Sequence, residues 1–144
     1  MKLATAIACI STMALVAIGN AYACDCRLTS AAKDAPVTTI IFKGFATEGP
    51  SDLSQGADYY NFSPTTIYKG DQKKSIIVYS PRDTCGQFFQ KNTEYMVFAS
   101  EYKGNISEYK GKLLTNICSS WPISARNSSN TKEVEEYFNK NKNK

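Results

Sequence analysis

The chain has 144 residues, 21% of them charged, with a formal net charge of +4 and no histidine. The absence of histidine excludes catalytic arrangements that need an imidazole base, such as Ser-His-Asp and Cys-His. The positive charge is mild and much of it lies near the C-terminus, so no nucleic-acid-binding surface is predicted. No phosphate-binding glycine loop is present, and we predict that the protein is not an enzyme and has no cofactor.

The first 23 residues have the pattern of a signal peptide. A basic start at Lys2 leads into an apolar stretch, and Ala21-Tyr22-Ala23 is an A-x-A cleavage site, so we expect the mature chain to begin at Cys24. The apolar stretch is shorter than the about 20 residues of a membrane-spanning helix, and no later segment is long enough. Secretion is therefore expected, with a periplasmic protein or a lipid anchor at Cys24 as alternatives. The bulky Tyr22 disfavours the lipid anchor.

Cysteine usage also indicates an oxidising compartment. Cys9 leaves with the signal, and the remaining Cys24, Cys26, Cys85 and Cys118 predict two disulfides in an exported chain. A Cys24–Cys26 bond would close a small strained ring. Two pairings remain open, and both tie the N-terminus to two distant points. A metal site is not predicted, because C-x-C is not the usual C-x-x-C spacing and histidine is absent.

Five short segments rich in β-branched and aromatic residues follow, separated by Gly, Pro and polar turns. They are residues 37–47, 59–68, 75–79, 95–102 and 112–117. Their number and spacing predict one all-β domain over residues 24–144, a five-stranded Greek-key barrel. Gly44 is expected to mark a β-bulge, and residues 82–92 to form a turn or a short helix.

A C-terminal helix is expected in a tail that begins near residue 125. Thr131 can cap this helix, and Glu133 and Glu135 suit its first turn, which places it over about residues 131–139. The lysines near the end of the chain indicate a solvated tail.

The start of the predicted mature chain, Cys24-Asp25-Cys26, constrains function most. If both cysteines are bridged, the α-amino group and the carbonyl of Cys24 are held close together. An α-amine has a pKa of about 8, so a substantial fraction can bind metal at neutral pH. The amine and carbonyl of one residue form a five-membered chelate, which can cap the open coordination position of a catalytic zinc. The alternative is that C-x-C only anchors the chain end.

Several segments resemble, in the same order, the inhibitory domain of the tissue inhibitor of metalloproteinases family. That family begins its mature chain with C-x-C, continues through a barrel, and has a strand-then-cysteine segment and a cysteine- and tryptophan-containing ending. The corresponding segments here are residues 24–26, 40–45, 67–70, 78–86 and 113–121. The likeness extends over most of the predicted mature chain.

The resemblance implies an oligosaccharide/oligonucleotide-binding (OB) barrel of the netrin-like type, with disulfides Cys24–Cys85 and Cys26–Cys118. It also implies an inhibitor whose partner is a zinc metalloprotease. Cys24 would chelate the protease's zinc, and Asp25 would enter the pocket that receives the substrate side chain after the cut. The flanking contacts would be Cys26, Arg27, Leu28, Ser80 and Pro81. We expect a monomer with no metal of its own.

Three departures from the family bear on this expectation. The third disulfide of the domain is missing, no second cysteine-rich domain follows Cys118, and Asp25 stands where the family usually has Thr or Ser. Burial of a carboxylate in an apolar pocket costs several kcal/mol unless it is paired. The second hypothesis is therefore a secreted netrin-like binding or structural module that does not inhibit proteases.

Overall fold

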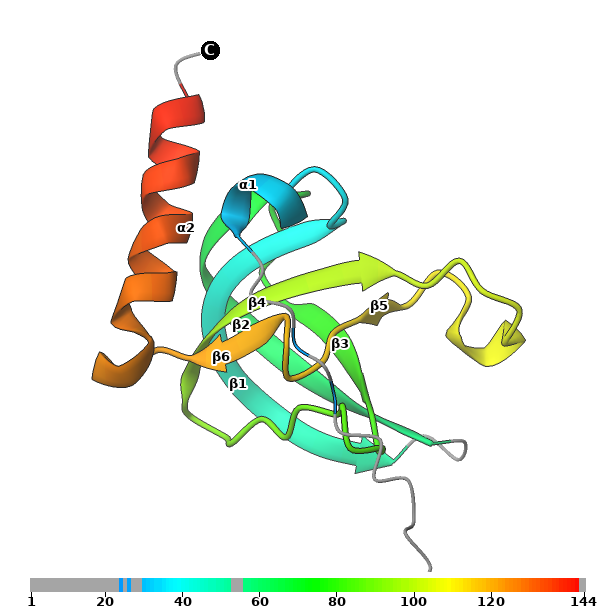
Figure 1. Ribbon diagram of the computed structural model, residues 1–144. Helices are drawn as coiled ribbons and strands as arrows, with labels where there is room; N and C mark the ends of the chain where they lie inside the picture. The colour runs from blue at the N-terminus through cyan, green and yellow to red at the C-terminus, as the bar shows by residue number, and fades with distance from the viewer. Residues whose placement is uncertain (1–23, 25, 27–29, 53–55, 143–144) are drawn as a thin grey trace, which may run out of the picture.

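The computed structural model describes Cys24, Cys26, residues 30–52 and residues 56–142. Its strands are β1 (Ile40–Asp52), β2 (Ala57–Lys69), β3 (Ile76–Pro81), β4 (Glu94–Glu101), β5 (Leu113–Leu114) and β6 (Ser120–Pro122). Its helices are α1 (Ala31–Asp34) and α2 (Ser128–Asn141), with 3₁₀ turns η1 (Ser107–Tyr109) and η2 (Ala125–Asn127). Figure 1 shows the strands curving into a barrel, with α2 standing along one side.

The barrel closes because β1 pairs with two neighbours. β1 is antiparallel to β2 on one edge and to β4 on the other, so the order β1-β2-β3-β5-β4 returns to β1. β5 and β6 share the second edge of β4, where Leu114 pairs with Ser100 and Ser120 pairs with Val97. Together they occupy the fifth position of the barrel. The predicted all-β, OB-like barrel with a C-terminal helix is confirmed.

Strand β1 bends at bulges, one of which is at Gly44. The register with β2 shifts between Lys43 and Gly44, as the sequence predicted. A Cβ at Gly44 would lie 2.7 Å from the carbonyl oxygen of Ser63 and 2.8 Å from Cα of Pro64. Glycine is therefore needed for this approach of two backbones. Pro64 lies opposite the bulge, where its missing N–H is tolerated, so β2 continues through it.

An aromatic cluster fills the barrel. Inward-facing residues alternate along the strands, as Tyr95, Val97 and Ala99 do in β4. The ring of Phe89 lies edge-on to those of Phe62 and Tyr95, with centroids 5.0 and 4.9 Å away. Edge-to-face pairs of this kind add to the free energy of simple apolar burial.

The outer face of β1 and β4 is covered by the helices. Ile41, Met96 and Phe98 point away from the barrel interior and are buried with Ala31 of α1 and Val134 of α2. Because both faces of these two strands are buried, their sequences contain consecutive apolar residues instead of strict alternation. Among the residues described, no helix is both long and apolar enough to cross a membrane.

A hydrogen-bonded ion pair fixes α2 beside the barrel. Lys43 Nζ and the Tyr68 hydroxyl both donate to the Glu135 carboxylate, at 3.0 and 3.2 Å. The hydrogen bond to Glu135 raises the pKa of Lys43, and burial raises the pKa of Tyr68. Both groups therefore keep their protons at neutral pH and remain donors.

The prediction that Thr131 caps the C-terminal helix is wrong. The helix begins earlier, at Ser128, with Asn127 at the N-cap position. Thr131 lies inside the helix at 8% exposure, and its hydroxyl accepts a hydrogen bond from Trp121 Nε1 at 3.1 Å. This tertiary contact outweighs the local capping signal.

The short helix α1 was not predicted, and residues 82–92 form turns without a helix.

Replacing Gly44 by alanine should destabilise the barrel by about 2 kcal/mol or more, because the added methyl group meets backbone atoms of β2. Urea unfolding measures the loss. Lys73→Ala, at an exposed position between β2 and β3, is the control. That change should cost no more than about 0.5 kcal/mol. Equal losses in the two variants would contradict the role assigned to Gly44.

Candidate functional site

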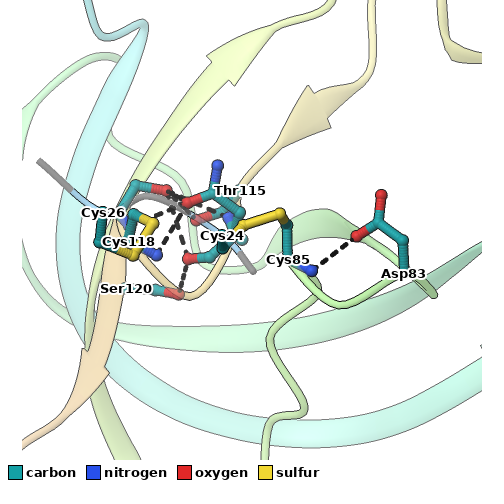
Figure 2. The surroundings of a disulfide bond; sticks show 9 residues. Cys24, Cys26, Asp83, Cys85, Thr115, Cys118 and Ser120 are labelled. Atoms are coloured by element: carbon teal, nitrogen blue, oxygen red, sulfur yellow. Dashed lines mark hydrogen bonds between the residues drawn. A yellow bond between two sulfur atoms is a disulfide. The ribbon is translucent and has the colours of Figure 1, made fainter. Parts of the chain in front are cut away.

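Two disulfides hold the first cysteines against the barrel. Cys24 is bonded to Cys85 and Cys26 to Cys118, with Cα–Cα distances of 5.2 and 5.1 Å (Figure 2). This is the pairing that the family resemblance implies. The bonded residues are 61 and 92 positions apart, and closing loops of this length stabilises the fold by about 2–4 kcal/mol per bridge.

Cys85 lies in the turn that follows β3. Its amide donates to Asp83 Oδ1 at 2.8 Å, and its carbonyl accepts a hydrogen bond from the Ile117 amide at 3.0 Å. The next residue, Gly86, passes so close to the Pro81 carbonyl that a Cβ would clash with it. The Cys85 turn is therefore tight. Its hydrogen bond to Ile117 joins it to the loop that carries the second disulfide.

Cys118 lies in that loop, between β5 and β6. The side-chain oxygen of Asn116 accepts hydrogen bonds from the amides of Cys118 and Ser119, at 2.9 and 3.1 Å. The Ser120 hydroxyl donates to the Asn116 carbonyl at 2.8 Å. These side-chain hydrogen bonds form a turn in place of the backbone pairing of a strand. The strand predicted over residues 112–117 therefore stops at Leu114.

A backbone hydrogen bond joins the first two cysteines. The Cys26 amide donates to the Cys24 carbonyl at 3.1 Å. Cys24 is half-buried and Cys26 is exposed, so both cysteines can be reached from solvent. A carbonyl oxygen has two lone pairs, and this hydrogen bond leaves one of them for another partner. The predicted site residues Asp25, Arg27 and Leu28 lie outside the described residues.

The predicted flanking residues Ser80 and Pro81 end β3. Ser80 is 1% exposed, and its hydroxyl accepts a hydrogen bond from the Gln87 amide at 2.6 Å. Its side chain therefore supports the Cys85 turn from inside instead of facing solvent. Pro81 is half-buried, and the next residue, Arg82, forms an ion pair with Asp58 at 2.7 Å. The reachable part of this segment is thus Pro81 and the turn after it.

Two side chains that shape the cysteine loops, Asp83 and Asn116, were not predicted from the sequence. Each precedes a bridged cysteine by two positions, and each accepts a hydrogen bond from that cysteine's amide. Asp and Asn favour turns because their side chains bond the backbone two residues further on. The repeated Asx-x-Cys spacing at Cys85 and Cys118 was the signal that could have located both turns.

The described part of the chain contains no group of three or more His, Cys, Asp or Glu side chains that could hold a metal ion. No protein-family model matches the sequence, and no curated protein matches it at a significant level. What the geometry offers is a surface segment at Cys24 and Cys26, fixed by two disulfides to neighbouring loops.

Replacing Asn116 by alanine should lower the free energy of unfolding by about 1–3 kcal/mol, because the amides of Cys118 and Ser119 lose their acceptor. It should also speed the reduction of the Cys26–Cys118 bond by dithiothreitol, followed by mass spectrometry. Asn105→Ala, in an exposed loop, is the matched control and should change neither quantity. Unchanged stability and reduction in Asn116→Ala would contradict its role in holding the Cys118 loop.

Proposed function

We propose that the protein is a secreted inhibitor of zinc metalloendopeptidases that acts through Cys24. The observation that carries the proposal is the double bracing of the segment: Cys24 and Cys26 are each disulfide-bonded to one of two adjoining loops. A chain end that served only as a terminus would need one anchor. Two anchors one residue apart leave the backbone of Cys24 with little freedom to move.

The chemistry depends on removal of the predicted signal peptide, which would give Cys24 a free α-amine. The amine nitrogen and the carbonyl oxygen would then bind the protease's zinc as a five-membered chelate, in the position a water occupies in catalytic sites. The hydrogen bond from the Cys26 amide supports this role, because it fixes the direction of the Cys24 carbonyl. Preorganisation of this kind reduces the entropy lost on binding.

The neighbouring loops would supply the rest of the contact. The Cys85 turn is joined to Cys24 and the Cys118 loop to Cys26, so both loops adjoin the bridged pair. Arg27 and Leu28 would extend the contact along the chain, as in the family that the sequence resembles. Ser80 would act indirectly, through its hydrogen bond to the Gln87 amide.

A second candidate function is favoured by one residue. Asp25 would carry its carboxylate into a largely apolar pocket of the protease, close to the catalytic glutamate, and this desolvation is costly without a partner. In that case the two disulfides would serve as braces only, and the barrel would be a binding or structural module. The two functions are separated by the following inhibition assays, which use the chain that begins at Cys24.

Adding one alanine before Cys24 should abolish inhibition of a panel of zinc endopeptidases. The added residue moves the free amine away from the Cys24 carbonyl, so the five-membered chelate can no longer form. An alanine added after Lys144 is the control and should leave the inhibition constant unchanged. Intact inhibition by the N-terminally extended protein would rule out the chelation mechanism.

Replacing Asp25 by threonine should tighten inhibition by about tenfold or more, because relief of about 1.4 kcal/mol of desolvation is a factor of ten in affinity. The inhibition constant against the same panel measures the change. Asp71→Thr, in the exposed turn after β2, is the control for loss of a negative charge elsewhere. If neither the unchanged protein nor Asp25→Thr inhibits any zinc endopeptidase, the non-inhibitory module is the better assignment.

A further inference from the structure

Three segments of the sequence match the acceptor pattern for N-linked glycosylation, which is Asn-x-Ser with any residue except proline in the middle. They are Asn61-Phe62-Ser63, Asn105-Ile106-Ser107 and Asn127-Ser128-Ser129. The pattern is short enough to arise by chance, so the surroundings of each asparagine decide whether the fold can carry a glycan there. A suitable asparagine reaches solvent and makes no contact that the glycan would break.

Asn61 lies in the middle of the sheet. It belongs to β2, where it is paired with Glu48 of β1 on one side and with Ile77 of β3 on the other. Its side-chain oxygen accepts a hydrogen bond from the Ser75 hydroxyl, and the residue is half-buried. A glycan on this side chain would disturb that bond and lie over the neighbouring strands. The folded protein therefore disfavours a glycan at Asn61.

Asn127 is engaged through the atom that would carry the sugar. It occupies the N-cap position of α2, and its Nδ2 donates to the Pro122 carbonyl at 3.2 Å and to the Ser124 hydroxyl at 3.5 Å. Glycosylation replaces one of the two hydrogens on Nδ2, so the sugar would have to lie where one of these acceptors is now. The fold therefore disfavours a glycan at Asn127 as well.

Asn105 meets both requirements. It lies between β4 and η1 and is exposed, as are Ile106, at 49%, and Ser107. Its side chain forms no hydrogen bond to any of the described residues. The Ile106 amide donates to the Tyr102 hydroxyl at 3.4 Å, and the Ile106 carbonyl accepts from the Tyr109 amide at 3.1 Å, so other groups hold this loop. Figure 1 shows the chain between β4 and β5 extending beyond the barrel, on the side away from α2.

We propose that Asn105 is the acceptor of an N-linked oligosaccharide, added in a eukaryotic secretory pathway. The donor is an oligosaccharide joined to a lipid through pyrophosphate. Nδ2 of Asn105 forms a bond to the anomeric carbon of the first sugar, the bond from that carbon to the pyrophosphate oxygen breaks, the lipid pyrophosphate leaves, and Nδ2 loses one proton. The proposal rests on secretion, which is part of the proposed function, and does not depend on protease inhibition.

The test is expression of the full chain, with its own residues 1–23, in cultured animal cells. Protein from the medium is treated with peptide-N-glycosidase in water labelled with oxygen-18, which converts each glycosylated asparagine to a labelled aspartate that peptide mass spectrometry detects. Most molecules should carry the label at Asn105, while Asn61 and Asn127 should remain asparagine. Cells degrade chains that fail to fold, so the secreted protein should carry its glycan where the fold tolerates one.

Two variants remove the acceptor pattern at exposed positions, where folding should be unaffected. Asn105→Gln replaces the acceptor, and Ser107→Ala removes the hydroxyl of the pattern while keeping Asn105. Each should abolish the loss of mass on glycosidase treatment. Ser63→Ala and Ser129→Ala are the matched controls, because they remove the other two patterns at exposed serines and should leave the glycan in place.

The outcomes separate the modification from secretion. Secreted protein without a glycan at Asn105, equal labelling of all three asparagines, or a glycan that persists in Asn105→Gln would each overturn the assignment of this site and leave secretion intact. A chain that stays inside the cells with residues 1–23 attached would instead overturn secretion, and the proposal with it.

Discussion

The antiparallel pairing of β1 with β4 is the contact on which the rest of the structure depends. The ladder runs from Ile40 opposite Ala99 to Phe45 opposite Glu94, and it turns an open sheet into a closed barrel. Closure removes the free edges that an open sheet would expose. β1 can serve both neighbours only because it bends, and the bend requires backbone contact between Gly44 and Ser63.

The same two strands link the barrel to everything outside it. Their inward residues form the aromatic core, and outward residues such as Ile41 and Met96 form the floor on which α1 and α2 lie. Helix α2 is then oriented by the Lys43–Glu135 ion pair and by the bond from Trp121 to Thr131. The surface that carries the two helices is thus a product of barrel closure, because β1 and β4 both contribute to it.

The strands could be predicted because apolar and β-branched runs bounded by Gly and Pro are local signals, and the bulge at Gly44 is such a signal too. Features that depend on distant contacts could not be. Thr131 has the local pattern of a cap, yet Trp121, ten residues earlier, makes it an interior contact. The burial of Ser80 likewise depends on Gln87 folding back over it. The cysteine pairing came from family resemblance, since spacing alone left two patterns open.

The two bridges also determine which parts of the molecule stay together after proteolysis. Cys24 and Cys26 are each joined to a residue far along the chain, while their own backbone connection to the barrel runs only through the residues before Ser30. A cut in that stretch would break the peptide link between the cysteines and the barrel, but the cut-off piece would remain attached through two covalent cross-links. The segment at Cys24 therefore belongs to the barrel by its sulfur bonds as well as by its peptide bonds, and a nicked molecule would still display it.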